Sequence, residues 1–149
     1  MLLKKAERRY RLQTGDYARL AAFRHAVREF LRFSEEAAQQ AGLTAQHYQA
    51  MLILRASVDG EQVTIRALAQ RLFIKHNSAV GLVDRLVGEG LVMRKSSEAD
   101  RREVELSLSA RGRQVLAKLA AVHRRELERI GPVLKRVLAS VLRDDALKR

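Results

Sequence analysis

The polar side chains that could take part in chemistry gather in one run, and the others are scattered. The run covers residues 95–102, with the sequence KSSEADRR, and is too polar to be buried. The four histidines show no His-x-x-x-His or Glu-x-x-His spacing, and there is no glycine-rich phosphate loop. No set of residues assembles a nucleophile, a base and an oxyanion donor. We therefore expect no catalytic site, metal site or cofactor, and we interpret the charged run as part of a binding surface.

Two short helical patterns precede this run, and two strand patterns flank it. Thr64 is placed as an N-cap before apolar residues with i, i+3, i+4, i+7 spacing, namely Ile65, Leu68, Ala69 and Leu72. The same spacing recurs at Ala79, Leu82, Val83 and Leu86. Residues 91–94 and 104–108 have strand character, so the charged run forms the tip of a hairpin. The segment predicts a winged helix-turn-helix, which offers one helix to a major groove and a wing to the flanking backbone or minor groove of DNA.

Composition restricts the classes of protein that remain. The chain has 149 residues, of which 47% are hydrophobic and 31% charged, with a formal net charge of +12. This positive excess suits a polyanion such as double-stranded DNA, although it would also suit an architectural or nonspecific nucleic-acid-binding protein. The absence of cysteine excludes disulfides and thiolate metal sites. No apolar run approaches the roughly 18 residues of a membrane span, and no signal peptide is recognisable. We therefore expect a cytoplasmic protein.

Further helices are predicted on both sides of the winged segment. Asp16 is expected to cap a long helix that runs to about residue 41, and Thr44 to cap the next helix. Ser109 is expected to cap a second long helix, which Gly131 and Pro132 should break before a separate last helix. The predicted fold is therefore mainly α with a small β wing.

The first and last helices carry apolar residues at alternating steps of three and four, as in a heptad seam. The small winged unit cannot cover both seams, so we predict a two-fold dimer interface, with packing inside one chain as the alternative. The expected division is residues 1–42 for an N-terminal arm and dimerisation helix, 43–112 for the DNA-binding domain, and 113–149 for the C-terminal dimerisation helices.

Five segments in this order resemble the MarR family of bacterial transcriptional regulators. They are Gly42-Leu43-Thr44, Leu68-Ala69, the run SAVGLVDRL at 78–86, Gly90-Leu91-Val92, and the run DRREVELSLSARG at 100–112. Each motif is weak alone, but their order and spacing are specific, and the resemblance covers nearly the whole chain. It implies a homodimer that binds short palindromes in promoters, commonly as a repressor released by a small, often aromatic, ligand.

The resemblance implies that the first turn of the recognition helix reads base edges. That turn corresponds here to Lys75, His76, Asn77 and Ser78. Asparagine can bond adenine through two hydrogen bonds, histidine and serine can donate or accept, and lysine can reach phosphate or guanine. Gly81 stands where many relatives carry a larger polar or basic side chain, which removes one reader. His76 could instead be only solvated, and Ser78 could serve mainly as an N-cap. Asp84 is acidic and would be repelled by phosphate, so we expect it to pair with a nearby arginine in a structural role.

The tip of the wing matches the strongest signature of the family. The resemblance implies that the acid, Asp100, orients an arginine, Arg102, and that this arginine enters the minor groove. Narrow A·T-rich minor grooves concentrate negative potential, which suits arginine. Arg101 and Lys95 are expected to contact phosphates, which position the protein without specifying sequence. A solvated charge run is the alternative.

The resemblance also implies an effector pocket between the helical and winged parts. Candidate lining residues are aromatic or flexible apolar side chains, namely Phe23, Phe30, Tyr48 and Met51, with Phe33 as a further aromatic and His25 or His47 as a polar group. An aromatic on a helical stripe is more often ordinary core than the wall of a ligand site.

Overall fold

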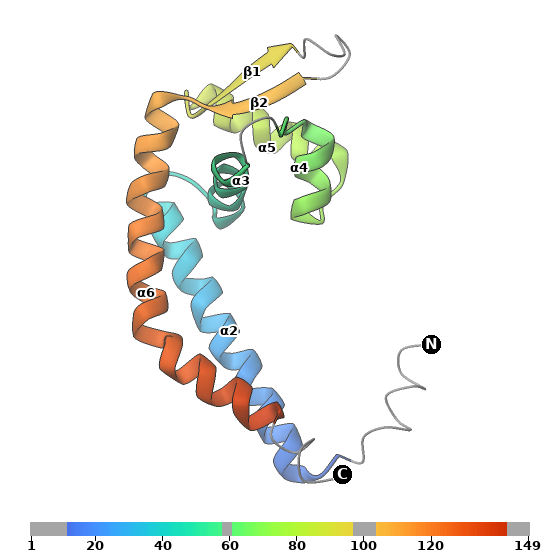
Figure 1. Ribbon diagram of the computed structural model, residues 1–149, viewed down its shortest axis with the longest axis vertical. Coiled ribbons are helices and arrows are strands. Elements are labelled where there is room, and N and C mark those ends of the chain that lie inside the picture. The colour runs from blue at the N-terminus through green and yellow to red at the C-terminus, as the bar shows by residue number, and fades with distance from the viewer. Residues whose placement is uncertain (1–11, 58–60, 97–103, 143–149) are drawn as a thin grey trace. The chain divides into compact units, whose positions relative to one another are not determined.

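A computed structural model describes residues 12–57, 61–96 and 104–142 (Figure 1). Over these residues the chain forms five helices and one two-stranded antiparallel sheet. In chain order they are α2 (Thr14–Gln40), α3 (Ala45–Ala56), α4 (Ile65–Leu72), α5 (His76–Gly88), β1 (Val92–Ser96), β2 (Val104–Leu108) and α6 (Ala110–Leu142). The predicted fold class, mainly α with a winged helix-turn-helix, is confirmed. Strand β1 lies one to two residues later than the sequence pattern indicated.

Local hydrogen bonds explain where the helices begin. The hydroxyl oxygens of Thr44, Thr64 and Ser109 each accept the backbone N–H three residues later, at 3.2, 3.2 and 2.9 Å. These three predicted N-caps are confirmed, and each satisfies a donor that the helix leaves unpaired. The prediction for Asp16 was wrong in detail, because α2 begins two residues before it. The Asp16 carboxylate instead reaches back to accept the Gln13 N–H at 2.7 Å, so it stabilises the helix from within its first turn.

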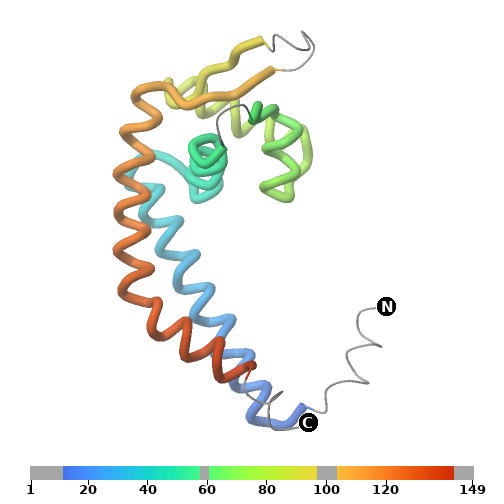
Figure 2. The backbone as a smooth tube through the Cα atoms, viewed as in Figure 1, coloured from blue at the N-terminus to red at the C-terminus, as the bar shows by residue number. Residues whose placement is uncertain are grey.

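The predicted break at Gly131 and Pro132 was wrong. Helix α6 runs without interruption from Ala110 to Leu142 and contains Pro132 in its interior (Figure 2). A proline removes one i→i−4 hydrogen bond and crowds the preceding turn, but it does not remove the bonds on either side. The long helix therefore continues through this position.

The described residues divide into two compact units. One contains residues 33–124, and the other contains the described parts of the chain before and after them. In the first unit α3, α4, α5, the wing and the start of α6 share one apolar core, whose largest fully buried side chains are Met51, Leu68, Val83 and Leu86. Strand β1 pairs with β2 in a register that places Val92 opposite Leu108. The Leu106 N–H donates to the Val63 carbonyl at 2.8 Å, which ties the wing to the segment before α4.

The first turn of α6 lies directly against the start of the wing. Gly112 is buried there, and a Cβ built on it would lie 2.0 Å from the carbonyl oxygen of Leu91. The Ser109 hydroxyl caps α6 and also donates to the Gly90 carbonyl at 2.6 Å. A glycine is therefore needed at position 112 for α6 and the wing to meet at this distance.

The second unit, which holds the N-terminal part of α2 and the C-terminal part of α6, exposes many large apolar side chains. They are Leu12, Tyr17, Leu20, Leu31, Leu127, Val133, Leu138 and Leu142. Among the helices that the structure describes, none combines the length and apolar character that a membrane crossing requires.

Candidate nucleic-acid interface

The first turn of α5 presents a group of exposed polar side chains. One face of α5 is buried in the core through Ala79, Leu82, Val83 and Leu86. On the other side His76, Asn77 and Ser78 are exposed, as is Lys75 at the N-cap position. Lys75 makes no side-chain cap bond, and Ser78 lies inside the first turn rather than at the cap. The N–H groups that begin α5 are therefore left without a side-chain cap, the arrangement that suits a helix N-terminus to anions.

Gly81 lies one turn further along the exposed side of α5. A Cβ added there would meet nothing within 4 Å. The backbone thus has room for a larger side chain at position 81, and with glycine there the exposed polar side chains of α5 lie in its first turn and at Asp84 and Arg85.

An ion pair holds the wing to α5. The Arg94 guanidinium on β1 donates to the Asp84 carboxylate on α5. The sequence predicted that Asp84 would pair with a nearby arginine, and the structure confirms it. Lys95 is exposed on the outer half of β1 and lies opposite Glu105 of β2.

The other predicted wing residues, Asp100, Arg101 and Arg102, lie outside the described residues. The structure therefore places the base of the wing and the recognition helix, and the roles of the tip residues stay predictions.

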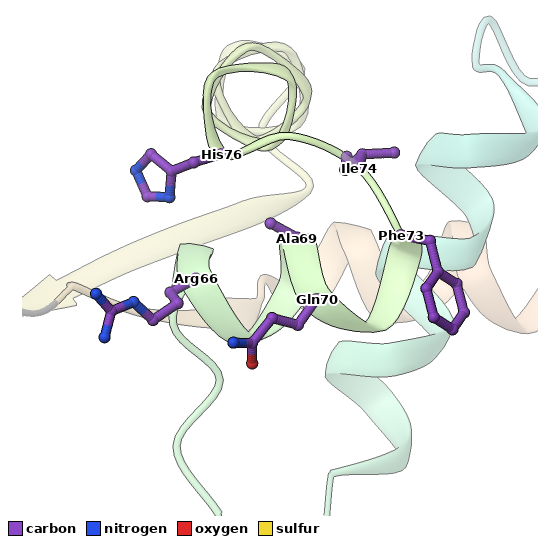
Figure 3. A pocket seen from close by; sticks show the side chains of 6 residues that line it. All are labelled: Arg66, Ala69, Gln70, Phe73, Ile74 and His76. Carbon is purple, nitrogen blue, oxygen red and sulfur yellow. The ribbon is translucent and has the colours of Figure 1, made fainter.

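A hollow of about 470 Å³ lies between the outer side of α4 and the start of α5 (Figure 3). Its lining comes from Arg66, Ala69, Gln70, Phe73, Ile74 and His76. Of these, the sequence indicated only His76 as a binding residue, and Ala69 only as an apolar position of the helix. Positions 66, 69, 70 and 73 lie along one side of a helix. Because their side chains are partly polar and partly apolar, they form no amphipathic pattern that would have indicated a site.

The proposed effector residues do not surround a described cavity. Met51 is fully buried in the core, and Tyr48 is buried against His123, with the two rings stacked at a centroid distance of 4.0 Å. Phe23 and Phe30 are half-buried on α2, in the other unit. An effector site formed by these residues stays a prediction.

His123 is a buried polar group that the sequence did not single out. Its Nε2 lies 2.8 Å from the hydroxyl of Ser34, and its Nδ1 lies 2.7 Å from the carbonyl oxygen of Leu119. Because a carbonyl can only accept, Nδ1 carries the proton, and in the neutral ring Nε2 accepts from Ser34. Phe33 adds an edge-on contact, with ring centroids 5.7 Å apart. These hydrogen bonds join α2 to α6, and the stacked ring of Tyr48 adds α3, so both ring nitrogens of His123 have partners, which suits a structural role.

His47 completes the cap of α3. Its Nδ1 accepts the Thr44 N–H at 3.1 Å and lies 2.8 Å from the Thr44 hydroxyl. Partial burial lowers the pKa of His47, and the nearby positive charge of Arg85 lowers it further, while Glu35 and Glu89 act in the opposite direction. The neutral imidazole is therefore the form that both the cap and the surroundings favour.

The positive charge of the chain is not concentrated in the winged segment. Residues 43–109 carry nine basic and eight acidic side chains, whereas residues 110–149 carry eleven basic and four acidic ones. On α6 all eight basic side chains are exposed. The net charge therefore does not by itself mark the DNA-binding face, and the geometry of α5 and the wing carries that inference. Among the described residues no group of His, Asp or Glu is placed to hold a metal ion.

Comparison with known proteins identifies a family profile and a regulator that are similar to this chain. The profile of the MarR family matches residues 41–103. The HTH-type transcriptional regulator SarZ of Staphylococcus epidermidis is 27% identical over 88 residues, which are 59% of this chain and 57% of SarZ. The chain thus matches little more than half the length of that curated relative.

Two solved structures extend the likeness to most of the chain. AbsC, a MarR family transcriptional regulator from Streptomyces coelicolor, has a TM-score of 0.74 at 23% identity and covers 93% of each chain, which shows a shared fold. The transcriptional repressor CouR, solved bound to a 23-mer DNA duplex, has a TM-score of 0.66 at 27% identity over 92% of this chain and 99% of that of CouR.

Proposed function

We propose that this chain, whose residues 41–103 match the profile of the MarR family and whose fold is shared with AbsC, is a transcriptional regulator of that family that binds a palindromic promoter site as a homodimer and represses transcription. The observation that carries the proposal is the first turn of α5. Its side chains are exposed, its N-terminus has no side-chain cap, and its opposite face is fixed in the core. A helix held in this way can enter a major groove with its orientation already set.

Within this proposal Asn77 and Ser78 read base edges, and His76 lies beside them. Lys75 and Lys95 contact phosphates, and Arg101 does the same from the wing. Arg102, oriented by Asp100, reads the width of the minor groove. The DNA bound to CouR supports DNA as the partner.

The exposed apolar side chains of the second unit support the homodimer. Tyr17 and Leu20 on α2, with Leu138 and Leu142 on α6, are each at least 40% exposed in the single chain. Sedimentation at micromolar concentration should give about twice the chain mass of 16.9 kDa. Leu138→Asp should produce monomers with unchanged helicity, because the charge would be buried only at the interface. A parent chain that sediments as a folded monomer would exclude the dimer.

Release by a small aromatic effector rests on the family resemblance alone. Tyr48 and Met51 would have to change their packing to line a site, since both are buried against other side chains. Nonspecific nucleic-acid binding is the second candidate function, and the exposed basic side chains of α6 are the observation that favours it.

Selection from a random-sequence duplex library separates the two functions. Sequence-specific binding should enrich a two-fold symmetric site, and nonspecific binding should enrich none. On the enriched duplex Asn77→Ala should lose about 1–3 kcal/mol per half-site, with little change on random DNA. Gln114→Ala is the matched control, because it removes an exposed amide from α6, away from the start of α5. Equal losses for the two variants would contradict the assignment of Asn77.

A further inference from the structure

We infer that Phe73 makes an apolar contact with the sugars of the DNA backbone at each half-site, beside phosphate contacts from Arg66. This inference rests on the proposed function and adds to it a contact surface on α4 and the turn that follows. Two features of Phe73, its exposure and its backbone conformation, call for an explanation, and the hollow beside it indicates the partner.

Phe73 combines an exposed aromatic ring with a strained backbone. It is 96% exposed, the largest exposed fraction among the large apolar side chains that the structure describes. Its φ of 55° and ψ of 40° place it in the left-handed region, where it ends α4 as the C-cap. Glycine or asparagine normally serves in this conformation, because a β-carbon is unfavourable there. Phe73 therefore costs stability, and it makes almost no contact within the chain that would offset this cost. Such an outlier is a reason to look for a function.

The hollow beside Phe73 has the polarity of a surface that meets nucleic acid. Arg66, Gln70 and His76 supply donors, while Phe73 supplies apolar area (Figure 3). Figure 3 shows Arg66 and His76 toward one end of the hollow and Phe73 at the other. Residues 65–76 include three basic side chains and no acidic one. The sugar and phosphate groups of one DNA strand alternate in the same way between apolar and anionic surface.

The position of the hollow makes it continuous with the proposed interface. His76 belongs both to the hollow and to the exposed first turn of α5. Phe73 and His76 are three positions apart in the chain, so their Cα atoms lie at most about 11 Å apart. A major groove is about 12 Å wide, so a helix end that enters it has a sugar–phosphate wall within that distance on each side. The chain that leads into α5 must pass over one of these walls. A protein–protein interface would need a larger apolar core than Phe73 and Ile74 provide on this stripe.

The test uses the full-length protein and the duplex enriched from a random library. Phe73→Asn removes the ring and keeps a residue that tolerates the left-handed conformation. We expect its affinity to fall about five- to tenfold per half-site on both the enriched and a random duplex, because sugars carry no sequence information. The dependence of affinity on salt should not change. Arg66→Gln should lower affinity and also reduce the slope of log affinity against log salt by about one per half-site. Phe73→Trp, which retains an aromatic ring, should bind within about twofold of the parent.

Thermal unfolding distinguishes a lost contact from a lost fold. Phe73→Asn should unfold at the same or a higher temperature than the parent, since it relieves the strained backbone. Unchanged DNA affinity in Phe73→Asn would overturn the inference while leaving the proposed function intact. If Phe73→Asn had a lower sedimentation mass than the parent but the same DNA affinity, the inference would also be overturned, and the ring would be assigned to self-association. If the parent chain enriched no duplex, the proposed function and this inference would fail together.

Discussion

Replacing Gly112 by alanine should destabilise the protein, although alanine is the better helix former. Inside a helix alanine is favoured over glycine by about 0.5–1 kcal/mol. At this position, however, the new Cβ would lie 2.0 Å from the carbonyl oxygen of Leu91 and 2.9 Å from its carbonyl carbon, where ordinary contact begins at 3.4 Å. Both atoms belong to the backbone, so no side-chain rotation relieves the overlap. Overpacking of this kind costs about 1–3 kcal/mol or more, which exceeds the gain in helix propensity.

Gly81→Ala is the matched control for this substitution. Gly81 is also helical, but a Cβ there meets nothing within 4 Å, so only the propensity gain of about 0.5–1 kcal/mol should remain. Thermal unfolding followed by circular dichroism should show a lower midpoint for Gly112→Ala and a higher one for Gly81→Ala, at about 2–4 °C per kcal/mol for a chain of this size. If both variants unfolded above the parent, the close approach of α6 to the wing would be refuted.

Three further outcomes follow from the site. The folded pKa of His47 lies below its unfolded value of about 6.5, so its stabilising contribution is complete above pH 6.5 and is lost as pH falls through the folded pKa. Urea unfolding at pH 7.5 and 5.5 should show this loss in the parent but less of it in His47→Gln, because the neutral amide of glutamine can still accept the Thr44 N–H. Equal pH dependence of the two proteins would contradict the role of His47. Arg94→Ala should lower the free energy of unfolding by less than about 1 kcal/mol, because the pair of Arg94 with Asp84 is solvent-exposed. It should nevertheless speed amide hydrogen exchange in β1, and unchanged exchange would show that the pair does not hold the wing. If the dimer neutralises roughly six to ten phosphates, affinity for the enriched duplex should fall about 10³–10⁵-fold between 50 and 200 mM salt, whereas a flat titration would mean that the basic side chains are not used.

Local chemistry made the starts of α3, α4 and α6 predictable from the sequence. Thr44, Thr64 and Ser109 cap their helices through bonds that span three residues, and such bonds depend little on the rest of the fold. The pairing of Asp84 was predictable for a related reason, since a carboxylate beside a proposed DNA face needs a cation. The order of helices and strands followed from apolar spacing, because each helix and strand buries one face.

Features that depend on distant residues were not predictable in the same way. The aromatic cluster at His123 joins residues that are 89 positions apart, and no local pattern indicates it. Pro132 was expected to end a helix, but the bonds on both sides maintain α6 through it. Phe73 occupies a position that usually requires glycine, so its left-handed conformation could not be inferred from its residue type.

The enclosure of His123 makes it a natural reporter for magnetic resonance. It is 4% exposed, its ring faces that of Tyr48, and the edge of Phe33 lies nearby. Ring currents from both neighbours should shift the resonances of its carbon-bound protons away from those of the more exposed His25, His47 and His76. Its Nδ1–H, held by the Leu119 carbonyl, should exchange slowly with water and give a separate resonance. One histidine signal can therefore follow the junction of α2, α3 and α6 during any titration, without a label and without a substitution.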